Sequence, residues 1–390
     1  MSVASQPESV DSRRTPPAER RSQGVGAPAL DVSALEVSAY EVPTDEPESD
    51  GTLEWNSTTL VLVEARAGEG VGIGFTYGDR AVATLVQSKL AAAVAGADAL
   101  SPPAAWARMR AALRNAGREG AGSMAISAVD IALWDLKARL LGLALADALP
   151  RFHRRVPVYG SGGFCSYSER RLREQLGGWV ADGIPRVKMK VGRDPERDEG
   201  RVRAAREEVG EAAELMVDAN GAYARTDALE WARRYAGQGV SWFEEPVSSD
   251  DLAGLRLLRD RRPAGMAIAA GEYGWDEFYF ERMLAAGAVD VLQADVTRCG
   301  GITGLLAVDG LCRARSIPLS AHCAPAISAH ACCGLAALEH LEYFHDHVRI
   351  ESMLFDGTLD PGGGFLEPDR DRPGLGLEFK RADAEEFAVE

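Results

Sequence analysis

Seven ionisable residues recur at nearly even steps between residues 186 and 352 of this 390-residue chain. Each ends a short apolar run and precedes a turn, and neighbours in the series lie 23 to 29 residues apart. The seven are Lys190, Asp218, Glu244, Glu272, Asp295, His322 and Glu351. One strand plus one covering helix occupies about that length, and the C-terminal ends of the strands of a closed parallel barrel share one rim. We therefore expect the seven side chains to surround one pocket.

The repeated units predict an eight-stranded parallel barrel over residues 151–355. VPVYGSG, at residues 156–162, supplies the first strand, and VRIE, at residues 348–351, is expected to supply the last. Amphipathic segments lie between the strands, as in TDALEWARRYAGQG at residues 226–239. Eight strands at this spacing favour a closed barrel over an open doubly wound sheet, although the period alone is compatible with both.

A smaller α+β unit precedes the barrel, over residues 30–150. Residues 30–74 alternate apolar and polar side chains between turns, which predicts an antiparallel meander. From residue 80 to 149 the period becomes helical, most clearly in SMAISAVDIALWDLKARLLG. The acidic segment 43–56 is expected to be a long surface loop. Residues 1–29 have the composition of a disordered tail, and residues 356–390 are expected to return to the first unit.

Composition limits the possible partners and the cellular compartment. A net charge of −16 disfavours nucleic acid and anionic membrane surfaces. No stretch approaches the roughly 18 to 20 apolar residues of a membrane span. The six cysteines show no CxxC spacing, so we expect reduced thiols and a cytoplasmic protein.

Three carboxylates predict a metal site. Asp218, Glu244 and Glu272 end the successive runs LMVD, SWFE and AIAAGE, so they should lie side by side at the rim. Three converging carboxylates repel each other unless a cation lies between them, and ligands that are all oxygen suit Mg²⁺. Asn220 shares the face of Asp218 and could bind a substrate hydroxyl, or could simply form the turn before Gly221.

Two further groups predict acid and base chemistry. Lys188 and Lys190 lie on one face of the strand VKMK, and two ammonium groups at that spacing lower each other's pKa, so one can act as a base. Asp295 and His322 end neighbouring strands, an arrangement that fixes the imidazole tautomer and supports proton transfer. Glu351 should face the same pocket, where it could share a proton with a substrate oxygen or pair with a buried cation.

In chain order these residues resemble the enolase superfamily, specifically its mandelate racemase subgroup. The resemblance rests on K-x-K at residues 188–190, D-x-N at 218–220, F-E-E-P at 243–246 and G-E at 271–272, followed by Asp295, His322 and Glu351. It extends over about residues 31–390. The resemblance implies an α+β capping domain over a modified TIM barrel, (β/α)7β.

The resemblance also implies a role for each residue. It makes Asp218, Glu244 and Glu272 the Mg²⁺ ligands, Lys190 the base on one face of the substrate, and His322 with Asp295 the dyad on the opposite face. The remaining roles fall to Lys188 and Ser161, which would contact the substrate carboxylate, and to Glu351, which would be the electrophilic acid.

The implied reaction is removal of the proton α to a carboxylate, giving an enediolate. We expect a small-molecule carboxylate substrate, most simply a sugar acid that is dehydrated, with racemisation or epimerisation of a 2-hydroxy acid as the alternative. Members of the family commonly form homo-oligomers, which we expect here too. A zinc hydrolase barrel would need an HxH pair on its first strand, which VPVYGSG does not have, and the intact set of acids, lysines and dyad disfavours a non-catalytic barrel.

Overall fold

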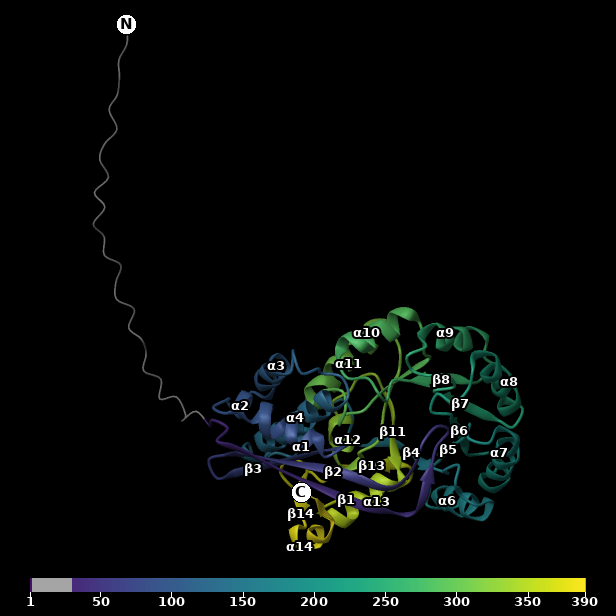
Figure 1. Cartoon of the computed structure of the whole chain (residues 1–390), viewed down its shortest axis with the longest axis horizontal. Coiled ribbons are helices and arrows are strands. Elements are labelled where there is room, and N and C mark those ends of the chain that lie inside the picture. Colours follow the sequence, from purple (N-terminus) through teal and green to yellow (C-terminus); the bar gives the residue numbers. More distant parts are fainter. Residues whose placement is uncertain (2–29, 390) are drawn as a thin grey trace.

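The computed structural model describes Met1 and residues 30–389 of the chain (Figure 1). Nearly all of the segment expected to be a disordered tail therefore lies outside the described residues. Within the described part, no helix is both long enough and apolar enough to cross a membrane. All six cysteines lie within it and carry free thiols.

An antiparallel sheet and a layer of helices form the first unit. The sheet has the order β15-β1-β2-β3, with β1 at Ala34–Ser49, β2 at Glu54–Ala67 and β3 at Gly70–Tyr77. The helices that follow are α1 (Ala81–Leu85), the π-helical η1 (Val86–Leu90), α2 (Ala91–Val94), α3 (Pro102–Ala112), α4 (Ala121–Leu140) and α5 (Leu145–Ala148). This agrees with the predicted meander followed by helices.

Helix α4 packs directly on β3 because glycines remove the side chains between them. A Cβ atom on Gly72 would lie 2.3 Å from the carbonyl oxygen of Ala132, and one on Gly74 would lie 2.4 Å from that of Ala128. No side chain fits at those distances, so alternate positions of β3 must be glycine. The glycine pattern of this strand therefore serves helix–sheet packing.

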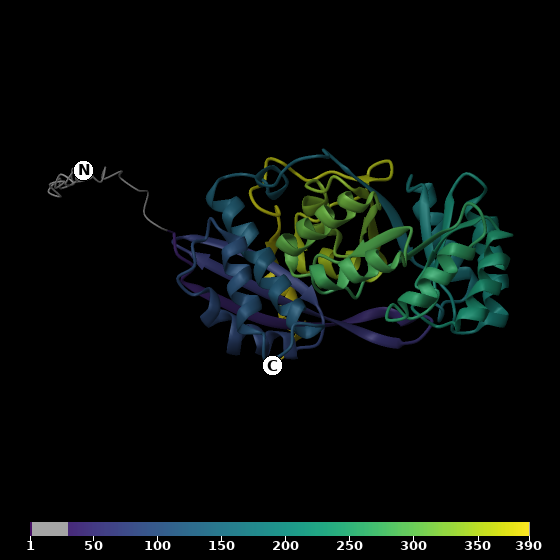
Figure 2. The ribbon, with the colours of Figure 1, turned by 90° about the horizontal axis from the view of Figure 1, so that it is seen from above.

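The expectation of a surface loop at residues 43–56 is wrong. β1 continues to Ser49 and β2 begins at Glu54, so most of the segment is a long hairpin with a register shift between Pro43 and Glu48. Its polar side chains are compatible with strands because the hairpin reaches from the cap to the barrel, where Glu48, Ser49 and Asp50 are buried. Figure 2 shows this hairpin extending beneath the barrel from the cap.

Eight parallel strands close into a barrel, as predicted. The strands are β4 (Val156–Gly162), β5 (Arg186–Lys190), β6 (Glu214–Asp218), β7 (Val240–Glu244), β8 (Ala267–Ala270), β9 (Val291–Ala294), β10 (Leu319–Ala321) and β11 (Leu338–Phe344). Pairing of β11 with β4 closes the ring. The covering helices are α6 (Glu169–Ala181), α7 (Pro195–Val209), α8 (Arg225–Ala236), α9 (Leu252–Arg261), α10 (Glu277–Ala286), α11 (Gly301–Arg315) and α12 (Pro325–Cys332).

The last strand is not where the sequence pattern put it. Residues 348–351 belong to helix α13 (His345–Leu354), and the eighth strand is β11, which ends at Phe344. VRIE matched the expected step from His322, but its surroundings have helical spacing, because the buried side chains of α13 are Asp346, His347, Ile350, Glu351 and Leu354.

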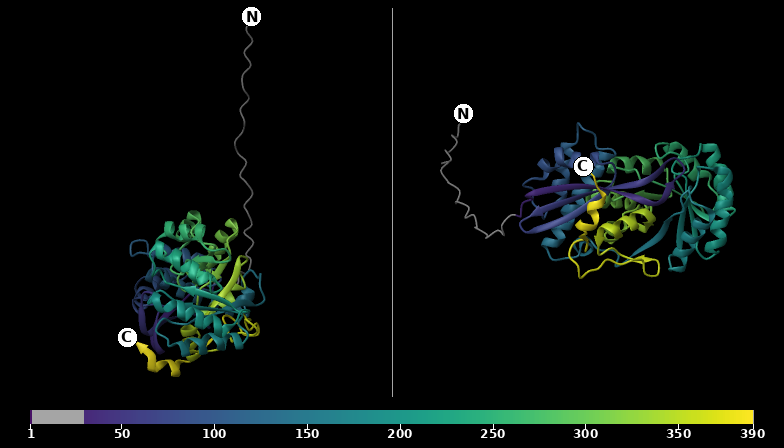
Figure 3. Two further views of the ribbon diagram at one scale, coloured as in Figure 1. Left: turned by 90° about the vertical axis from the view of Figure 1, so that its right-hand side faces the viewer. Right: turned by 60° about the horizontal axis from the view of Figure 1, so that its bottom comes forward.

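The C-terminal segment runs back along both units (Figure 3). Its elements are β12 (Phe355–Asp356), β13 (Phe365–Leu366), β14 (Glu378–Phe379), α14 (Arg381–Ala384), the 3₁₀ turn η2 (Glu385–Phe387) and β15 (Ala388–Val389). β13 pairs with β4 of the barrel, whereas β15 pairs with β1 of the cap. Arg381 also forms an ion pair with Glu64 on β2. The segment therefore ties the cap to the barrel.

Candidate active site

A cavity of about 330 Å³ lies between the rim of the barrel and the cap. The strand ends and the turns after them supply one wall, and the β1–β2 hairpin and β3 supply the other. The lining includes Lys190, Asn220, Glu272, Arg298, His322 and Cys323 from the barrel side, and Asp50, Leu53, Trp55, Thr58 and Tyr77 from the cap. Of the seven evenly spaced ionisable residues, only Lys190, Glu272 and His322 line this cavity.

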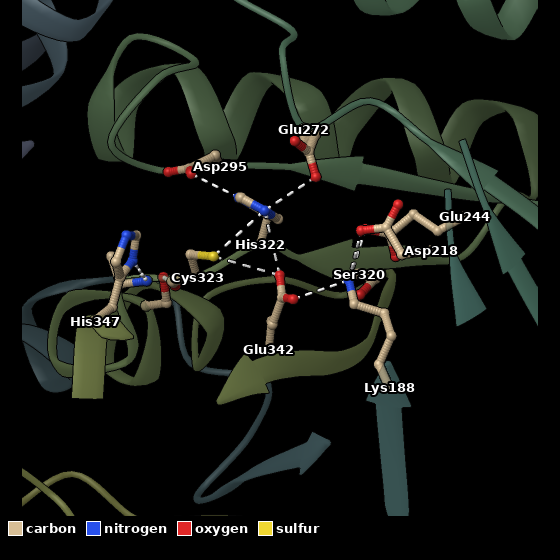
Figure 4. Close-up of polar contacts among 12 residues, drawn as sticks. Lys188, Asp218, Glu244, Glu272, Asp295, Ser320, His322, Cys323, Glu342 and His347 are labelled. Atoms are coloured by element: carbon tan, nitrogen blue, oxygen red, sulfur yellow. Dashed lines mark hydrogen bonds and ion pairs between the residues drawn. The ribbon is translucent and has the colours of Figure 1, made fainter. Parts of the chain in front are cut away.

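The three predicted metal ligands come together. Asp218 and Glu244 are paired neighbours at the ends of β6 and β7, and Glu272 follows β8 by two residues. Oxygen atoms of the three carboxylates lie within 4.8 Å of one another, and all three side chains are buried (Figure 4). Burial and the charge of Asp218 raise the pKa of Glu244 to about 8. Buried, mutually repelling oxygen donors fit a hard divalent cation such as Mg²⁺.

Both predicted lysines lie against these acids. Lys188 Nζ is 2.6 Å from Glu244 Oε1, and Lys190 Nζ is 2.5 Å from Asp218 Oδ2. Burial lowers the pKa of Lys190 and so does the charge of Lys188, but Asp218, Glu272 and Glu244 together more than offset both, and the net shift is upward. The sequence pattern predicted that the two lysines lower each other's pKa, but it did not predict the contact between Lys190 and Asp218.

The predicted dyad is also formed. His322 Nδ1 is 2.7 Å from Asp295 Oδ2, so the ring presents Nε2 to the cavity wall. Nε2 lies 3.1 Å from Glu272 Oε2. Burial opposes the charged imidazolium, yet the surrounding anionic groups raise the pKa of His322 well above its usual range. These contacts therefore favour the protonated ring of His322.

Lys190 and His322 approach the cavity from different sides. Lys190 ends β5 and His322 follows β10, and in the ring these strands are separated by β4 and β11 on one side and by β6 to β9 on the other. A molecule between them can meet an amine on one side and an imidazole on the other.

Glu351 does not occupy the position expected of it. It lies on α13 rather than at a strand end, accepts hydrogen bonds from Ala326 N at 2.9 Å and from the Tyr77 hydroxyl at 3.2 Å, and does not line the cavity. Burial raises its pKa to about 8. Glu351 belongs to a helix and not to a barrel strand, so the barrel does not place its side chain at the rim.

Glu342 on β11 takes the place at the site that was expected for Glu351. Its Oε1 is 2.8 Å from Lys188 Nζ, and its Oε2 is 3.3 Å from His322 Nε2, so it links the lysine side to the dyad side (Figure 4). The sequence held a signal for it. In LEHLEYF the side chains of His340 and Glu342 share one face of a strand and alternate with Leu341 and Tyr343.

The two expected substrate-contacting residues differ in position. Asn220 lines the cavity in a left-handed backbone conformation, with φ at 45°, and its Oδ1 has no hydrogen-bond partner. Ser161 is buried at the end of β4 beside Lys188, and its Oγ is likewise unpartnered, but it is not part of the cavity lining. Arg298, Cys323, Trp55 and Tyr77 also line the cavity, and the sequence pattern did not predict them as site residues.

Comparison with known proteins agrees with this geometry. Residues 171–384 match the family described as enolase C-terminal domain-like, and residues 35–149 match the mandelate racemase / muconate lactonizing enzyme N-terminal domain. A curated relative, the 3,6-anhydro-alpha-L-galactonate cycloisomerase of Streptomyces coelicolor, is 35% identical over 330 residues, which cover 83% of this chain and 90% of that protein.

Two solved structures extend the comparison. A mandelate racemase/muconate lactonizing enzyme-like protein from Rubrobacter xylanophilus is 69% identical, with a TM-score of 0.91 over 92% of this chain and 100% of that one. The L-talarate/galactarate dehydratase of Salmonella typhimurium LT2, liganded with Mg and L-lyxarohydroxamate, is 26% identical, with a TM-score of 0.85 over 99% of this chain and 98% of that one. The chain belongs to the enolase superfamily, in its mandelate racemase branch.

Proposed function

We propose that this enzyme dehydrates a sugar acid after removing the proton α to its carboxylate. The observation that carries the proposal is the placement of Lys190 and His322 on different sides of one cavity beside three buried carboxylates. In this proposal Asp218, Glu244 and Glu272 hold Mg²⁺. When bound, Mg²⁺ stabilises the negative charge that develops on the substrate carboxylate.

Lys190 is the base. Its contact with Asp218 favours the charged amine, while burial and Lys188 favour the neutral one. If Asp218, Glu244 and Glu272 held the metal, their charges would stabilise the ammonium less, while burial and Lys188 would still favour the neutral amine. Lys190 would then take the α-proton from its side of the substrate. Lys188 is already held between Glu244 and Glu342, where its charge balances two acids and can contact the substrate carboxylate.

His322 is the acid. Asp295 fixes its tautomer and the raised pKa keeps the ring protonated, so Nε2 can deliver a proton to the departing β-hydroxyl as water leaves. The remaining polar groups fit binding roles. We assign Glu342, rather than Glu351, to hydrogen bonding with the enediolate oxygen, and Asn220 and Ser161, whose side-chain oxygens have no partner, to the substrate.

The cavity wall favours a polyhydroxylated substrate. Asp50, Thr58, Asn220 and Arg298 line it together with Asp346, and these groups supply several hydrogen-bond donors and acceptors beyond the reacting centre. An aryl substrate would leave Asn220 Oδ1, which has no partner in the protein, unpaired, and this costs free energy in a buried site. Dehydration is also the activity named for the talarate/galactarate dehydratase, a structural relative.

Cycloisomerisation is the second candidate, because a relative with 35% identity carries that name. Cycloisomerisation and racemisation would begin with the same proton transfer as dehydration, but their products have not lost water. Incubating the Mg²⁺-loaded enzyme with a panel of sugar acids in D₂O, with chelator-treated enzyme as control, separates the outcomes. We expect a 2-keto acid lighter by one water. Deuterium uptake without loss of water would reject dehydration in favour of one of the isomerisations.

We also infer a cytoplasmic, homo-oligomeric protein. Six free thiols, five of them buried, support a reducing compartment. Light scattering of the purified protein should give a mass that is a multiple of 41.7 kDa. A monomer would contradict the second inference.

A further inference from the structure

A second cluster of metal-ligating atoms lies beside the three carboxylates and differs from them in chemistry. His322 Nε2, Cys323 Sγ and Glu342 Oε2 form a triangle with sides of 3.3, 3.4 and 3.3 Å. All three residues are buried, and the three contacts are visible in Figure 4. The set contains one nitrogen, one sulfur and one oxygen, whereas the neighbouring set contains only oxygen.

The size of this triangle matches a tetrahedral zinc ion. Zinc binds sulfur at about 2.3 Å and nitrogen or oxygen at about 2.0 to 2.2 Å, which puts neighbouring ligand atoms about 3.3 to 3.6 Å apart. The observed sides fall at the lower end of that range. Mixed nitrogen and sulfur donors favour zinc over Mg²⁺, so the two neighbouring clusters differ in the cation they select.

The backbone brings the cysteine to this position. Consecutive side chains of a strand point to opposite sides, yet those of His322 and Cys323 both line the cavity. The chain achieves this with two successive residues in the left-handed region, Cys323 at φ 52° and Ala324 at φ 46°. The Ser328 hydroxyl donates to the Cys323 carbonyl at 2.8 Å and fixes the turn.

We propose that His322, Cys323 and Glu342 form an inhibitory site for Zn²⁺ or a similar thiophilic divalent cation, with the fourth position open to the cavity. Binding replaces the thiol proton, which leaves to solvent, by a bond from sulfur to the metal. The same ion also replaces the proton on His322 Nε2, which leaves to solvent, so this nitrogen can then neither carry nor deliver a proton. The effect on activity rests on the proposed function, whereas the binding itself does not.

Co²⁺ tests the site without substrate, because a thiolate ligand gives cobalt a charge-transfer absorption that oxygen ligands do not. The protein is first saturated with Mg²⁺ to fill the carboxylate cluster. We expect the band in the wild type and in Cys165→Ser, which removes a thiol outside the cavity lining, and its loss in Cys323→Ser. A wild type that shows no band, or a Cys323→Ser protein that keeps it, would overturn the proposal.

Equilibrium dialysis with Zn²⁺ in excess Mg²⁺ gives a second measurement. Cys323→Ser should weaken zinc binding by more than about tenfold, since even an outer-shell partner of a metal site is worth that much. If Cys323→Ser does not fold, Cys323→Ala replaces it, and a wild type that takes up no zinc is decisive without either variant.

Turnover separates this inference from the proposed function. Zn²⁺ should inhibit the wild type over the concentration range in which it binds, and should inhibit Cys323→Ser only at higher concentrations, each compared with its own zinc-free rate. Metal binding without turnover of any sugar acid would reject the proposed function and leave the site standing. Full turnover of zinc-saturated wild type would reject the inhibition.

Discussion

The two walls of the cavity are built differently. The barrel wall takes one side chain from each of several strand ends, and its reactive groups are fully buried and held by ion pairs, as Lys188 is between Glu244 and Glu342. The cap wall comes mainly from the tip of one hairpin and from β3. There Leu53 is 65% exposed, and Trp55 is only partly buried.

The difference suggests a division of labour. Side chains fixed by a closed barrel cannot move without disturbing their neighbours on adjacent strands, so they suit a reaction that is common to a family. A hairpin that lies outside the closed barrel can change its sequence at little cost to the barrel core, so it suits the choice of substrate. Substitutions in the two walls should therefore change different kinetic constants.

The largest effect should come from the barrel wall. Lys190→Ala removes the proposed base and should lower kcat by about 10² to 10⁴-fold, the usual contribution of a positioned general base. The measurement is the rate of keto-acid formation together with α-proton exchange in D₂O. Lys380→Ala is the matched control, because Lys380 donates to the Ser352 carbonyl and pairs with Asp356, and none of these residues lines the cavity. Normal exchange in Lys190→Ala would remove the lysine from the chemistry.

Glu342 and Glu351 provide the next comparison, within the barrel unit. Glu342→Gln should lower kcat by about 10² to 10³-fold, the range for one group that stabilises charge in the transition state. Glu351→Gln should leave kcat within a few-fold of the wild type, because Glu351 contacts Tyr77 and Ala326, whereas Glu342 contacts Lys188 and His322. The assay of keto-acid formation measures both variants. A larger loss of kcat in Glu351→Gln than in Glu342→Gln would return the role of electrophilic acid to Glu351.

This pair shows where sequence patterns sufficed and where they did not. Five site residues could be predicted because each ends or closely follows a short apolar strand, and a closed barrel brings all strand ends to one rim. They are Asp218, Glu244, Glu272, Asp295 and His322. Glu342 was missed because the last step of the barrel is short. β11 begins at Leu338, 17 residues after β10 ends at Ala321, and only the short helix α12 lies between them. VRIE lies at the expected step from His322, but it belongs to helix α13 and not to a strand.

The cap could be predicted as a class of structure but not in its contacts. Alternation predicted the strands, and helical spacing predicted α4. The burial of Glu48 and Asp50 depends on the barrel that receives them, and Trp55 packs edge-on against Phe164 of the loop after β4. No local pattern carries such contacts between distant segments.

A substitution in the cap wall should change binding more than turnover. The Trp55 indole donates to Glu48 Oε2 at 2.9 Å, and the ring lines the cavity. Trp55→Phe keeps an aromatic ring but removes that donor, so the hairpin tip should be held less firmly and KM should rise several-fold, as expected for one lost hydrogen bond. kcat should stay within about twofold. Steady-state kinetics on two sugar acids measure both constants.

Two outcomes would change the comparison of the walls. An equal fall of kcat and kcat/KM in Trp55→Phe would place the cap in the chemical step. A changed preference between the two sugar acids, with kcat intact, would strengthen the assignment of substrate choice to the hairpin. Glu54→Gln, on the exposed part of the same hairpin and outside the cavity lining, removes the ion pair with Arg193 and controls for a general loosening of the tip.

The smallest effect concerns the contact between the two walls, where Glu351 on α13 meets Tyr77 of the cap. Burial raises the pKa of Glu351 to about 8, above the value of about 4.3 expected in the unfolded chain. The folded state therefore binds a proton more tightly, and this contribution to stability is complete below about pH 4 and is lost as the pH rises toward 8. Glu351→Gln stays neutral throughout, so it should gain stability relative to the wild type between pH 5 and pH 8.

Urea unfolding at the two pH values measures this difference, with Glu69→Gln on the exposed β2–β3 turn as the surface control. The gain at pH 8 should reach a few kcal/mol at most, since each pKa unit is worth about 1.4 kcal/mol and a hydrogen bond to Ala326 N already favours the charged form. A difference independent of pH would mean that Glu351 is ionised in the folded protein. It would then be a buried anion beside the cavity, and its exclusion from the reaction would have to be reconsidered.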